Sequence, residues 1–322
     1  MKPKMNQVLW SLVLTASLIF MVGCNGLDDA EPIMEDSSDL MDIPATLKSI
    51  EDGLTDQNYP DARVKKPTYA TFNAALGSSG LASVFARNEL TVFAPTDAAF
   101  AELGLNPGNI RSVENLRDIL LYHVVPGTVL STDLEEGFVN MQLGLSAVIS
   151  LEDGPMVNNA NIIMTDKKAR NGVIHGIDAV LLPANLAELL SYNNDFSLLY
   201  QAVGAAGLAD AVASGTLTIF APNNAAFVDL LGELKLGSLA EVLEAVGEDG
   251  LRDILLYHVV GGKVLAADLS NGEVESLLEE TFTVDLSGPK LIDNKGRESF
   301  ILNTDVIATN GAIHEISRVI LP

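Results

Sequence analysis

The chain has 322 residues and is 48% hydrophobic, which is typical of globular domains and excludes a largely disordered protein. Its formal net charge of −24 argues against binding to nucleic acid or anionic lipid through a basic surface. Cys24 is the only cysteine, so disulfides cannot staple the domains and their stability must come from packing.

The first 24 residues are predicted to be a lipoprotein signal peptide. Lys2 and Lys4 form a short positive region, and residues 8–22 are an apolar run too short for a comfortable membrane span. The run ends in the sequence MVGC, which resembles a bacterial lipobox in which the cysteine is lipidated after cleavage. We therefore expect a lipid anchor at Cys24. An ordinary signal peptide and a signal anchor are the alternatives.

Residues 25–43 are rich in aspartate and glutamate, and this composition predicts a solvated tether. Acidic residues just after a lipidated cysteine also resemble the surface-export signal of lipoproteins in the Bacteroidetes group. We therefore expect an exported outer-membrane lipoprotein that is exposed at the cell surface, with a plain linker as the alternative.

Three sequence blocks recur in the same order. TVFAPTDAAF at 91–100 returns as TIFAPNNAAF at 218–227, LRDILLYHVV occurs at 116–125 and 251–260, and NGVIHGIDAVLLP at 171–183 returns as NGAIHEISRVILP at 310–322. The chain is therefore predicted to be two copies of one domain, at 44–183 and 184–322. The spacing between matching blocks grows along the chain, which indicates an insertion in the second copy near residues 239–250.

Each copy begins with a helical pattern, in which Tyr69 and Phe72 correspond to Phe196 and Leu199. A strand follows at residues 90–94 and ends at Pro95. Thr96 is expected to cap the next helix, which would bury Phe100 and Leu103, and Asn223 takes the capping position in the second copy.

Ser112 is a candidate cap for a further helix that ends at Tyr122, after which Val124 enters a strand or turn. Short strands and turns follow, and the last strand is predicted at residues 173–182. The fold class is therefore α+β, with several short helices packed on an antiparallel sheet system.

Together, the strand–Pro–helix block, the central Tyr-His pair and the terminal NG…H…LLP block resemble the fasciclin, or FAS1, domain. The resemblance covers residues 44–322 and both copies. It implies two tandem FAS1 domains, each a wedge-shaped β-sandwich with flanking short helices. It also implies extracellular and usually non-enzymatic roles in adhesion or ligand binding.

The resemblance also implies candidate binding residues. In animal fasciclin-type proteins, an Asp-Ile pair and a Tyr-His region have been proposed as contacts for integrin receptors. The matching positions are Asp118, Ile119, Tyr122 and His123 in the first copy and Asp253, Ile254, Tyr257 and His258 in the second. A structural helix face is the alternative, because Leu116, Ile119 and Leu120 share helical spacing.

All four histidines lie in the repeated blocks, at His123, His175, His258 and His314. A metal site or a catalytic base would be one interpretation. The structural interpretation is favoured, because His175 lies in the middle of an apolar strand and His123 can bind the last carbonyl groups of a helix. No metal-ligand spacing accompanies them, and neither a metal nor a cofactor is expected.

No nucleophile elbow, P-loop or calcium loop is present, so the chain is not expected to be an enzyme, and a hydrolase is the least favoured function. The expected function is lipid-anchored adhesion at the cell surface, in which two FAS1 modules make bivalent contact with a protein or glycan partner of the surface or matrix. The alternative is a glycan-binding accessory lipoprotein of a nutrient-uptake system. The aromatic content of 6% counts against that alternative.

Overall fold

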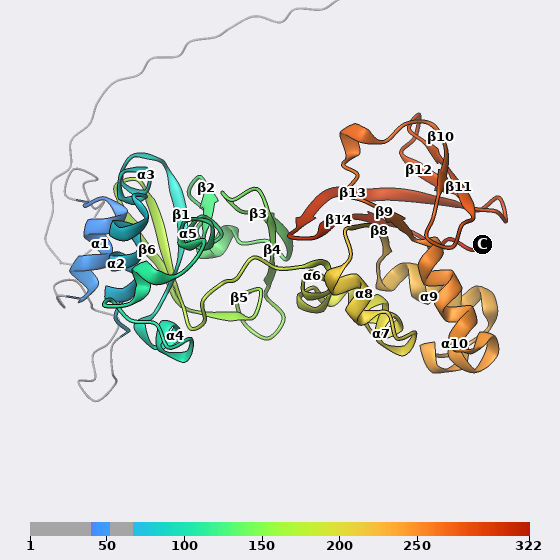
Figure 1. Ribbon diagram of the computed structural model, residues 1–322, viewed down its shortest axis with the longest axis horizontal. Coiled ribbons are helices and arrows are strands. Elements are labelled where there is room, and N and C mark those ends of the chain that lie inside the picture. The colour runs from blue at the N-terminus through green and yellow to red at the C-terminus, as the bar shows by residue number, and fades with distance from the viewer. Residues whose placement is uncertain (1–39, 52–66) are drawn as a thin grey trace, which may run out of the picture. The chain divides into compact units, whose positions relative to one another are not determined.

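A computed structural model of the chain describes residues 40–51 and 67–322. The predicted signal peptide, Cys24 and most of the predicted tether lie outside the described residues. The described part contains two domains of the same architecture, and each is built on a seven-stranded sheet with short helices beside it (Figure 1).

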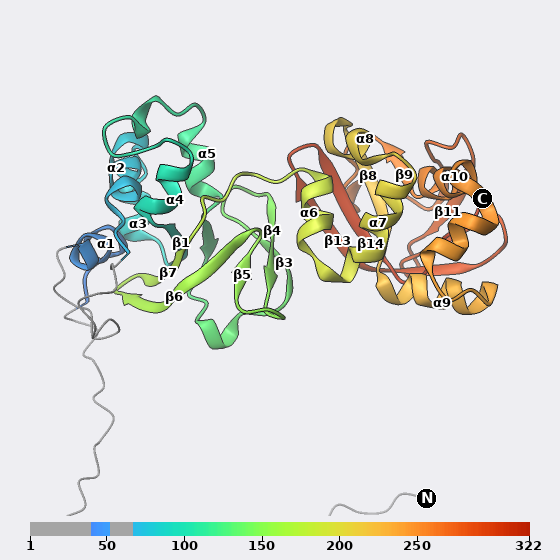
Figure 2. The same cartoon turned by 90° about the horizontal axis from the view of Figure 1, so that it is seen from below.

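The first domain runs from α1 to β7, and its helices are gathered on one side of the strands β1 and β7 (Figure 2). Its helices are α1 (Ile43–Glu51), α2 (Ala70–Ser79), α3 (Ala82–Arg87), α4 (Asp97–Glu102) and α5 (Leu116–Leu121). Its strands are β1 (Leu90–Pro95), β2 (Val124–Pro126), β3 (Gly137–Asn140), β4 (Ser146–Ser150), β5 (Met156–Val157), β6 (Ala160–Ala169) and β7 (Gly172–Ile177).

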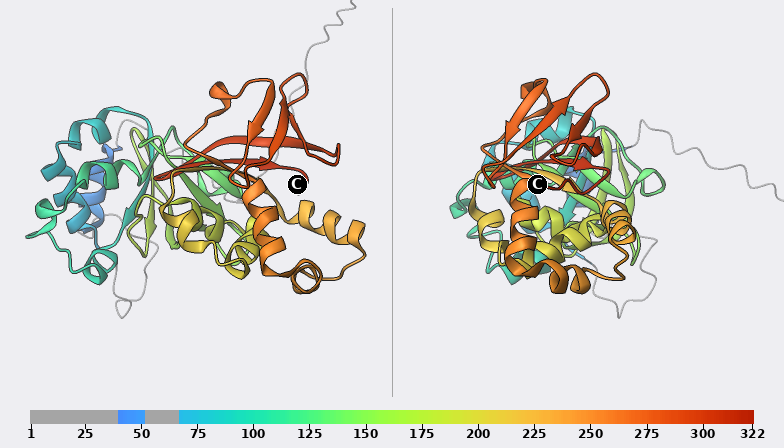
Figure 3. Two further views of the ribbon diagram at one scale, coloured as in Figure 1. Left: turned by 45° about the vertical axis from the view of Figure 1, so that its right-hand side comes forward. Right: turned by 90° about the vertical axis from the view of Figure 1, so that its right-hand side faces the viewer.

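The second domain runs from α6 to β14. Its helices lie on one side of β13 and β14, and the strands β10 to β12 lie on the other (Figure 3). Its helices are α6 (Leu186–Tyr192), α7 (Ser197–Ala205), α8 (Ala209–Ser214), α9 (Asn224–Leu234) and α10 (Leu239–Tyr257). Its strands are β8 (Leu217–Pro222), β9 (Val259–Gly261), β10 (Gly272–Glu275), β11 (Thr281–Asp285), β12 (Lys290–Ile292), β13 (Glu298–Ala308) and β14 (Gly311–Ile316).

The strand order is β2-β1-β7-β6-β5-β4-β3 in the first domain, and the second domain repeats it as β9-β8-β14-β13-β12-β11-β10. Neighbouring strands are antiparallel except β1 with β7 and β8 with β14, which are parallel. The prediction of an antiparallel sheet system is wrong at this one pair in each domain. The last strand returns beside the first after a crossover through helices and strands, which is the kind of connection that parallel strands require.

The sandwich arises because one long strand belongs to both halves of the sheet. The strand β6 pairs with β5 at its start and with β7 further along, and its register with β7 shifts twice between Ile162 and Lys167. Asp166 has a φ of 56° within this irregular stretch, and Asp305 has a φ of 60° at the matching place in β13. Phe93, Tyr122 and other apolar residues fill the core between the two halves.

The Asn-Gly pair at the start of the last strand of each domain allows neighbouring elements to pack closely. Gly172 has a φ of 139°, and a Cβ atom there would lie 1.8 Å from the carbonyl oxygen of Leu90. Only glycine fits, because β1 approaches the backbone directly. The Asn171 side chain accepts a hydrogen bond from the N–H of Ile43 at 3.1 Å and donates to the carbonyl of Phe85 at 2.7 Å. The sequence repeat NG therefore preserves a junction between the first helix, the third helix and the sheet.

The predicted cap at Thr96 and the predicted strand before Pro95 are confirmed, whereas three other local predictions are wrong. The Thr96 Oγ1 atom accepts the N–H of Ala99 at 3.1 Å, as predicted for the cap of α4. Leu103 is 49% exposed rather than buried, because α4 ends at Glu102 and Leu103 lies beyond it. Ser112 ends a 3₁₀ turn instead of capping a helix, and α5 begins only after Asn115.

The third difference is that the final strand is shorter than predicted. The strand β7 ends at Ile177, and the following segment leaves the sheet before Leu182. The alternation of apolar residues continues past the strand because that segment is also packed: Val180 and Leu181 are buried without pairing in the sheet.

The insertion in the second copy forms the first part of α10. This helix has 19 residues, whereas its counterpart α5 has 6. Gly247 interrupts α10 with a φ of 74° and a ψ of 174°, so the inserted turns and the repeated block are two helical pieces.

Candidate functional site

The candidate binding residues lie at the end of α5 in the first domain and at the end of α10 in the second. On α5, Leu116 and Leu120 face the core, Asp118 is exposed and Ile119 is half-buried. On α10, Asp253 is likewise exposed and Ile254 half-buried. The carboxylate of each Asp-Ile pair is therefore open to solvent, while the isoleucine is partly engaged in packing.

Tyr122 and Tyr257 are fully buried. The Tyr122 hydroxyl donates a hydrogen bond to the carbonyl of Ser146 at 2.7 Å and accepts one from the Asn158 side chain at 3.1 Å. Burial raises the pKa of the Tyr122 hydroxyl, so it stays neutral and keeps its proton for Ser146. The Tyr257 hydroxyl donates to the carbonyl of Thr281 at 2.8 Å.

His123 and His258 are buried and use both ring nitrogens on backbone groups. The Nδ1–H of His123 donates to the carbonyl of Ile119 at 2.7 Å, and its Nε2 accepts the N–H of Leu181 at 2.9 Å. His258 makes the same pair of bonds to Ile254 and Ile320. Burial lowers the pKa of each ring to about 4, so both rings are neutral near pH 7.

His175 and His314 have the same kind of role in the sheet. The Nε2–H of His175 donates to the carbonyl of Val129 at 3.0 Å, and its Nδ1 accepts the N–H of Asp166 at 3.3 Å. His314 repeats this arrangement with Val264 and Asp305. The favoured interpretation of His123 and His175 as structural residues agrees with these partners. Within residues 40–51 and 67–322, no group of three or more His, Cys, Asp or Glu side chains could hold a metal ion.

A groove lies beside Asp118 and Ile119 in the first domain. Its apolar lining comes from three parts of the domain, namely α5, the turn between β3 and β4, and the segment after β7. The first-domain residues that line it are Glu114, Asn115, Asp118, Ile119, Leu143, Leu145, Leu182 and Pro183. The groove therefore combines an exposed apolar floor with carboxylates at its rim.

The second domain does not reproduce this lining. The turn between β10 and β11 has Glu280 where the first domain has Leu145, and Glu280 is exposed. Ile254, the counterpart of Ile119, lines an internal cavity described below. The two Asp-Ile pairs therefore stand in different surroundings, although the ten residues of the block are identical.

Leu143, Leu145 and Leu182 were not predicted from the sequence to be part of a binding site. Leu143 and Leu145 lie between β3 and β4, and Leu182 lies in the irregular segment after β7, where neither helical nor strand periodicity marks a shared face. The one available signal was the difference between the copies, because a leucine in one turn aligns with a glutamate in the other.

The structure repeats one sandwich twice, with a buried Tyr-His pair in each copy and a groove beside Asp118 in the first copy. The Fasciclin domain model matches residues 67–183 and 194–322, so the chain belongs to the fasciclin domain family. The prediction of two tandem FAS1 domains is thereby confirmed.

Two relatives illustrate the range of the family. The chain is 31% identical over 246 residues to the Transforming growth factor-beta-induced protein ig-h3 of Sus scrofa, a match covering 72% of this chain and 34% of that protein. It is 29% identical over 138 residues to the Cell surface glycolipoprotein MPB83 of Mycobacterium bovis, covering 41% of this chain and 63% of that protein. The chain thus spans about a third of the length of the animal relative.

Among solved structures, the chain is similar to a FAS1 domain pair from the insect cell adhesion molecule Fasciclin I. The TM-score is 0.48 at 18% identity, over 78% of this chain and 96% of that one. No helix within the described ranges is both long and apolar enough to cross a membrane.

Proposed function

We propose that this chain is a lipid-anchored protein of the cell surface that binds a protein partner of the surface or matrix, and that it is not an enzyme. The proposal is supported by the family membership, by the similarity to a protein named as a cell surface glycolipoprotein, and by the apolar N-terminal run that ends in the sequence MVGC. The non-enzymatic role is supported by the histidines, whose ring nitrogens are all engaged with backbone groups.

The groove beside Asp118 is the observation that carries the contact site. An apolar floor of Leu143, Leu145 and Leu182 offers area to bury, and Glu114 and Asp118 offer charge at the rim. Such a surface suits an apolar peptide segment flanked by lysine or arginine. Tyr122 and His123 lie below the surface, so they position the end of α5 rather than touch the partner.

We propose that both domains contact the partner, but with unequal affinity. Asp253 is exposed as Asp118 is, but Glu280 removes apolar area beside it. We therefore expect the first domain to contribute most of the affinity, with Asp253 and its surroundings as a weaker second contact.

The test is adhesion of cells that display the full chain, measured on matrix-coated surfaces and on partner cells. Asp118→Lys should reduce adhesion, and Leu145→Glu, which introduces the residue of the second domain, should do the same. Glu102→Lys is the matched control, because it makes the same charge change at an exposed position of α4.

A glycan array on the same protein distinguishes the alternative function. Loss of adhesion in Asp118→Lys and Leu145→Glu, with Glu102→Lys unaffected, supports the proposal. Glycan binding without cell adhesion would contradict it and favour the accessory role in nutrient uptake.

A further inference from the structure

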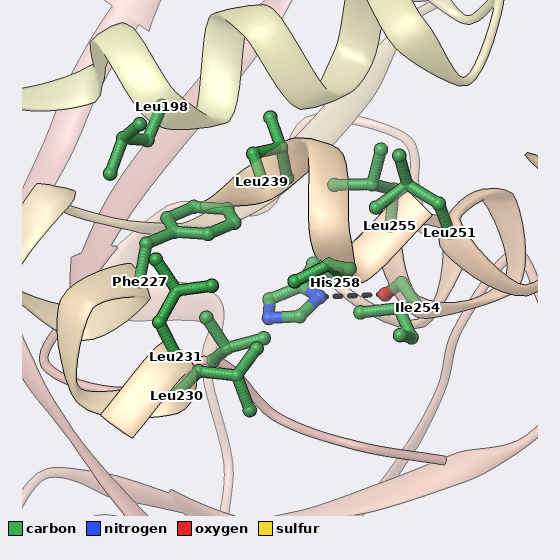
Figure 4. A pocket seen from close by; sticks show the side chains of 11 residues that line it. Leu198, Phe227, Leu230, Leu231, Leu239, Leu251, Ile254, Leu255 and His258 are labelled. Carbon is green, nitrogen blue, oxygen red and sulfur yellow. Dashed lines mark hydrogen bonds between the residues drawn. The ribbon is translucent and has the colours of Figure 1, made fainter. Parts of the chain in front are cut away.

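A largely enclosed cavity of about 20 Å³ lies in the second domain among α7, α9 and α10 (Figure 4). This volume holds about one water-sized group. Apart from His258, every residue that lines it is aliphatic or is Phe227. The cavity belongs to the helical layer and does not coincide with the groove described above.

His258 contributes no free hydrogen-bonding atom to the cavity. Its Nδ1–H is bound to the carbonyl of Ile254 at 2.8 Å, as Figure 4 shows, and its Nε2 accepts the N–H of Ile320 at 3.0 Å. A water molecule needs two to four polar partners to be held in a buried site. The cavity is therefore suited to an apolar group and not to water.

The helical layer beside His258 contains fewer aromatic side chains than the layer beside His123. In the first domain, the ring of Phe72 lies 6.0 Å from the ring of His123 and 6.3 Å from that of Phe85. The repeat alignment places Leu199 at the position of Phe72 and Val212 at the position of Phe85. Leu199 and Val212 do not line the cavity themselves, but they pack in the same core as several residues of its wall. The second domain therefore fills this layer with smaller side chains.

The roof of the cavity is built by residues that the first domain lacks. Leu239 and Val242 come from the insertion, and Leu231 lies in the part of α9 that extends beyond the length of α4. The roof segment is bounded by two interruptions of the helical backbone, Lys235 with a φ of 58° and Gly247 with a φ of 74°. The backbone departs from helical geometry at both residues, which makes them the candidate hinge points of the segment.

The charges on the roof restrict what can enter. Asp229 is exposed on α9, and Glu241 and Glu244 are exposed on α10. Glu233 forms ion pairs with Arg297 at 3.3 Å and with Arg318 at 3.5 Å. These carboxylates repel an anionic amphiphile such as a fatty acid. They do not hinder a neutral molecule, and the half-exposed side chains of Leu234 and Val246 offer it apolar surface nearby.

We propose that the second domain binds the hydrocarbon part of a small neutral molecule in the cavity above His258. The ligand enters when the roof segment 236–246 moves outward about Lys235 and Gly247, and the cavity widens to hold it. This site is independent of the adhesion groove and adds ligand binding to the proposed function.

The experiment uses the full chain and the neutral fluorescent probe N-phenyl-1-naphthylamine. We expect saturable binding of one probe per chain. Leu231→Phe places a larger side chain in the cavity and should weaken binding roughly tenfold or more. Leu103→Phe makes the same change at an exposed position of the first domain and should leave binding unchanged.

Two further measurements make the outcome decisive. Thermal unfolding checks that Leu231→Phe is folded, and Val242→Ile, which adds a single methylene, replaces it if it is not. Displacement of the probe by 1-dodecanol but not by dodecanoate supports the selection for neutral ligands. An absence of saturable binding, equal binding by the wild type and the cavity-filling variant, or equal displacement by dodecanoate would overturn the proposal.

Discussion

The Nε2 atom of His123 accepts the backbone N–H of Leu181 at 2.9 Å and thereby joins the end of α5 to the segment that follows β7. The other ring nitrogen donates to Ile119 within α5. The neutral ring satisfies one donor and one acceptor of the buried backbone at once. A protonated ring would lose its acceptor and place a buried charge against the N–H of Leu181.

Acidification should therefore destabilise both domains. Burial lowers the pKa of His123 and His258 to about 4 in the folded state, against an ordinary value of 6.5. The unfolded chain binds these protons more readily, so the stabilisation is complete above about pH 6.5 and is lost as the pH falls towards 4. The expected loss is on the order of 2 kcal/mol for each ring, measured by urea unfolding between about pH 7 and pH 4.5.

A His123→Asn variant separates this effect from the titration of carboxylates. The variant should be less stable than the wild type near pH 7, because the bond to Leu181 is lost. It should also lose less stability on acidification, because one titrating ring is gone. An equal loss in variant and wild type would show that His123 does not contribute to the acid sensitivity.

Removing the Tyr122 hydroxyl should destabilise the first domain by about 1–3 kcal/mol. Tyr122→Phe leaves the Ser146 carbonyl and the Asn158 side chain without their buried partner. Equilibrium urea unfolding measures the change. Tyr200→Phe is the control, because that side chain is 45% exposed and its loss of a hydroxyl should change stability by less than about 0.5 kcal/mol. Similar effects in both variants would contradict the role assigned to the Tyr122 bond.

Gly172→Ala should prevent the first domain from folding stably, at a cost of about 4 kcal/mol or more. The new Cβ atom would meet the carbonyl oxygen of Leu90, and the φ of 139° is unfavourable for alanine. Gly77→Ala is the contrasting change, because Gly77 lies in α2 with nothing within 4 Å of a new Cβ atom. That variant should gain up to about 1 kcal/mol. Soluble expression and urea unfolding report both results, and a stable Gly172→Ala domain would refute the close approach of β1.

Cys24→Ala should release the chain from membranes into the soluble or secreted fraction. A lipidated cysteine supplies the hydrocarbon that anchors the protein, and the variant has no site for it. Fractionation with immunoblotting measures the distribution, with wild type as reference. Retention of Cys24→Ala in the membrane would mean that residues 8–22 act as a signal anchor.

Much of the architecture could be predicted from local patterns. The duplication, the strand before Pro95 and the caps at Thr96 and Asn223 follow from sequence identity and from side chains that act within a few residues. The end of the last strand could not be predicted this way, because Leu181 is buried by packing outside the sheet and alternates as a strand residue would. Ser112 failed as a cap because the chain turns again before Leu116.

The position of the candidate site at the end of a helix could be predicted from the sequence, but the residues that surround it could not. The identical blocks at residues 116–125 and 251–260 predict equal surroundings, yet Leu145 stands beside one and Glu280 beside the other. The burial of Tyr122 depends on Ser146 and Asn158, which are distant in sequence. No periodicity within the block carries that information.

The amino-acid sequence by itself determined that one domain was duplicated, that Thr96 and Asn223 cap helices after a strand, and that the family is fasciclin, because these features depend on neighbouring residues and on direct repetition. The tertiary structure alone decided the parallel pairing of β1 with β7, the groove beside Asp118 and the cavity above His258. Each of these depends on whether side chains from separate segments fill the space between them, and that is a property of packing in three dimensions.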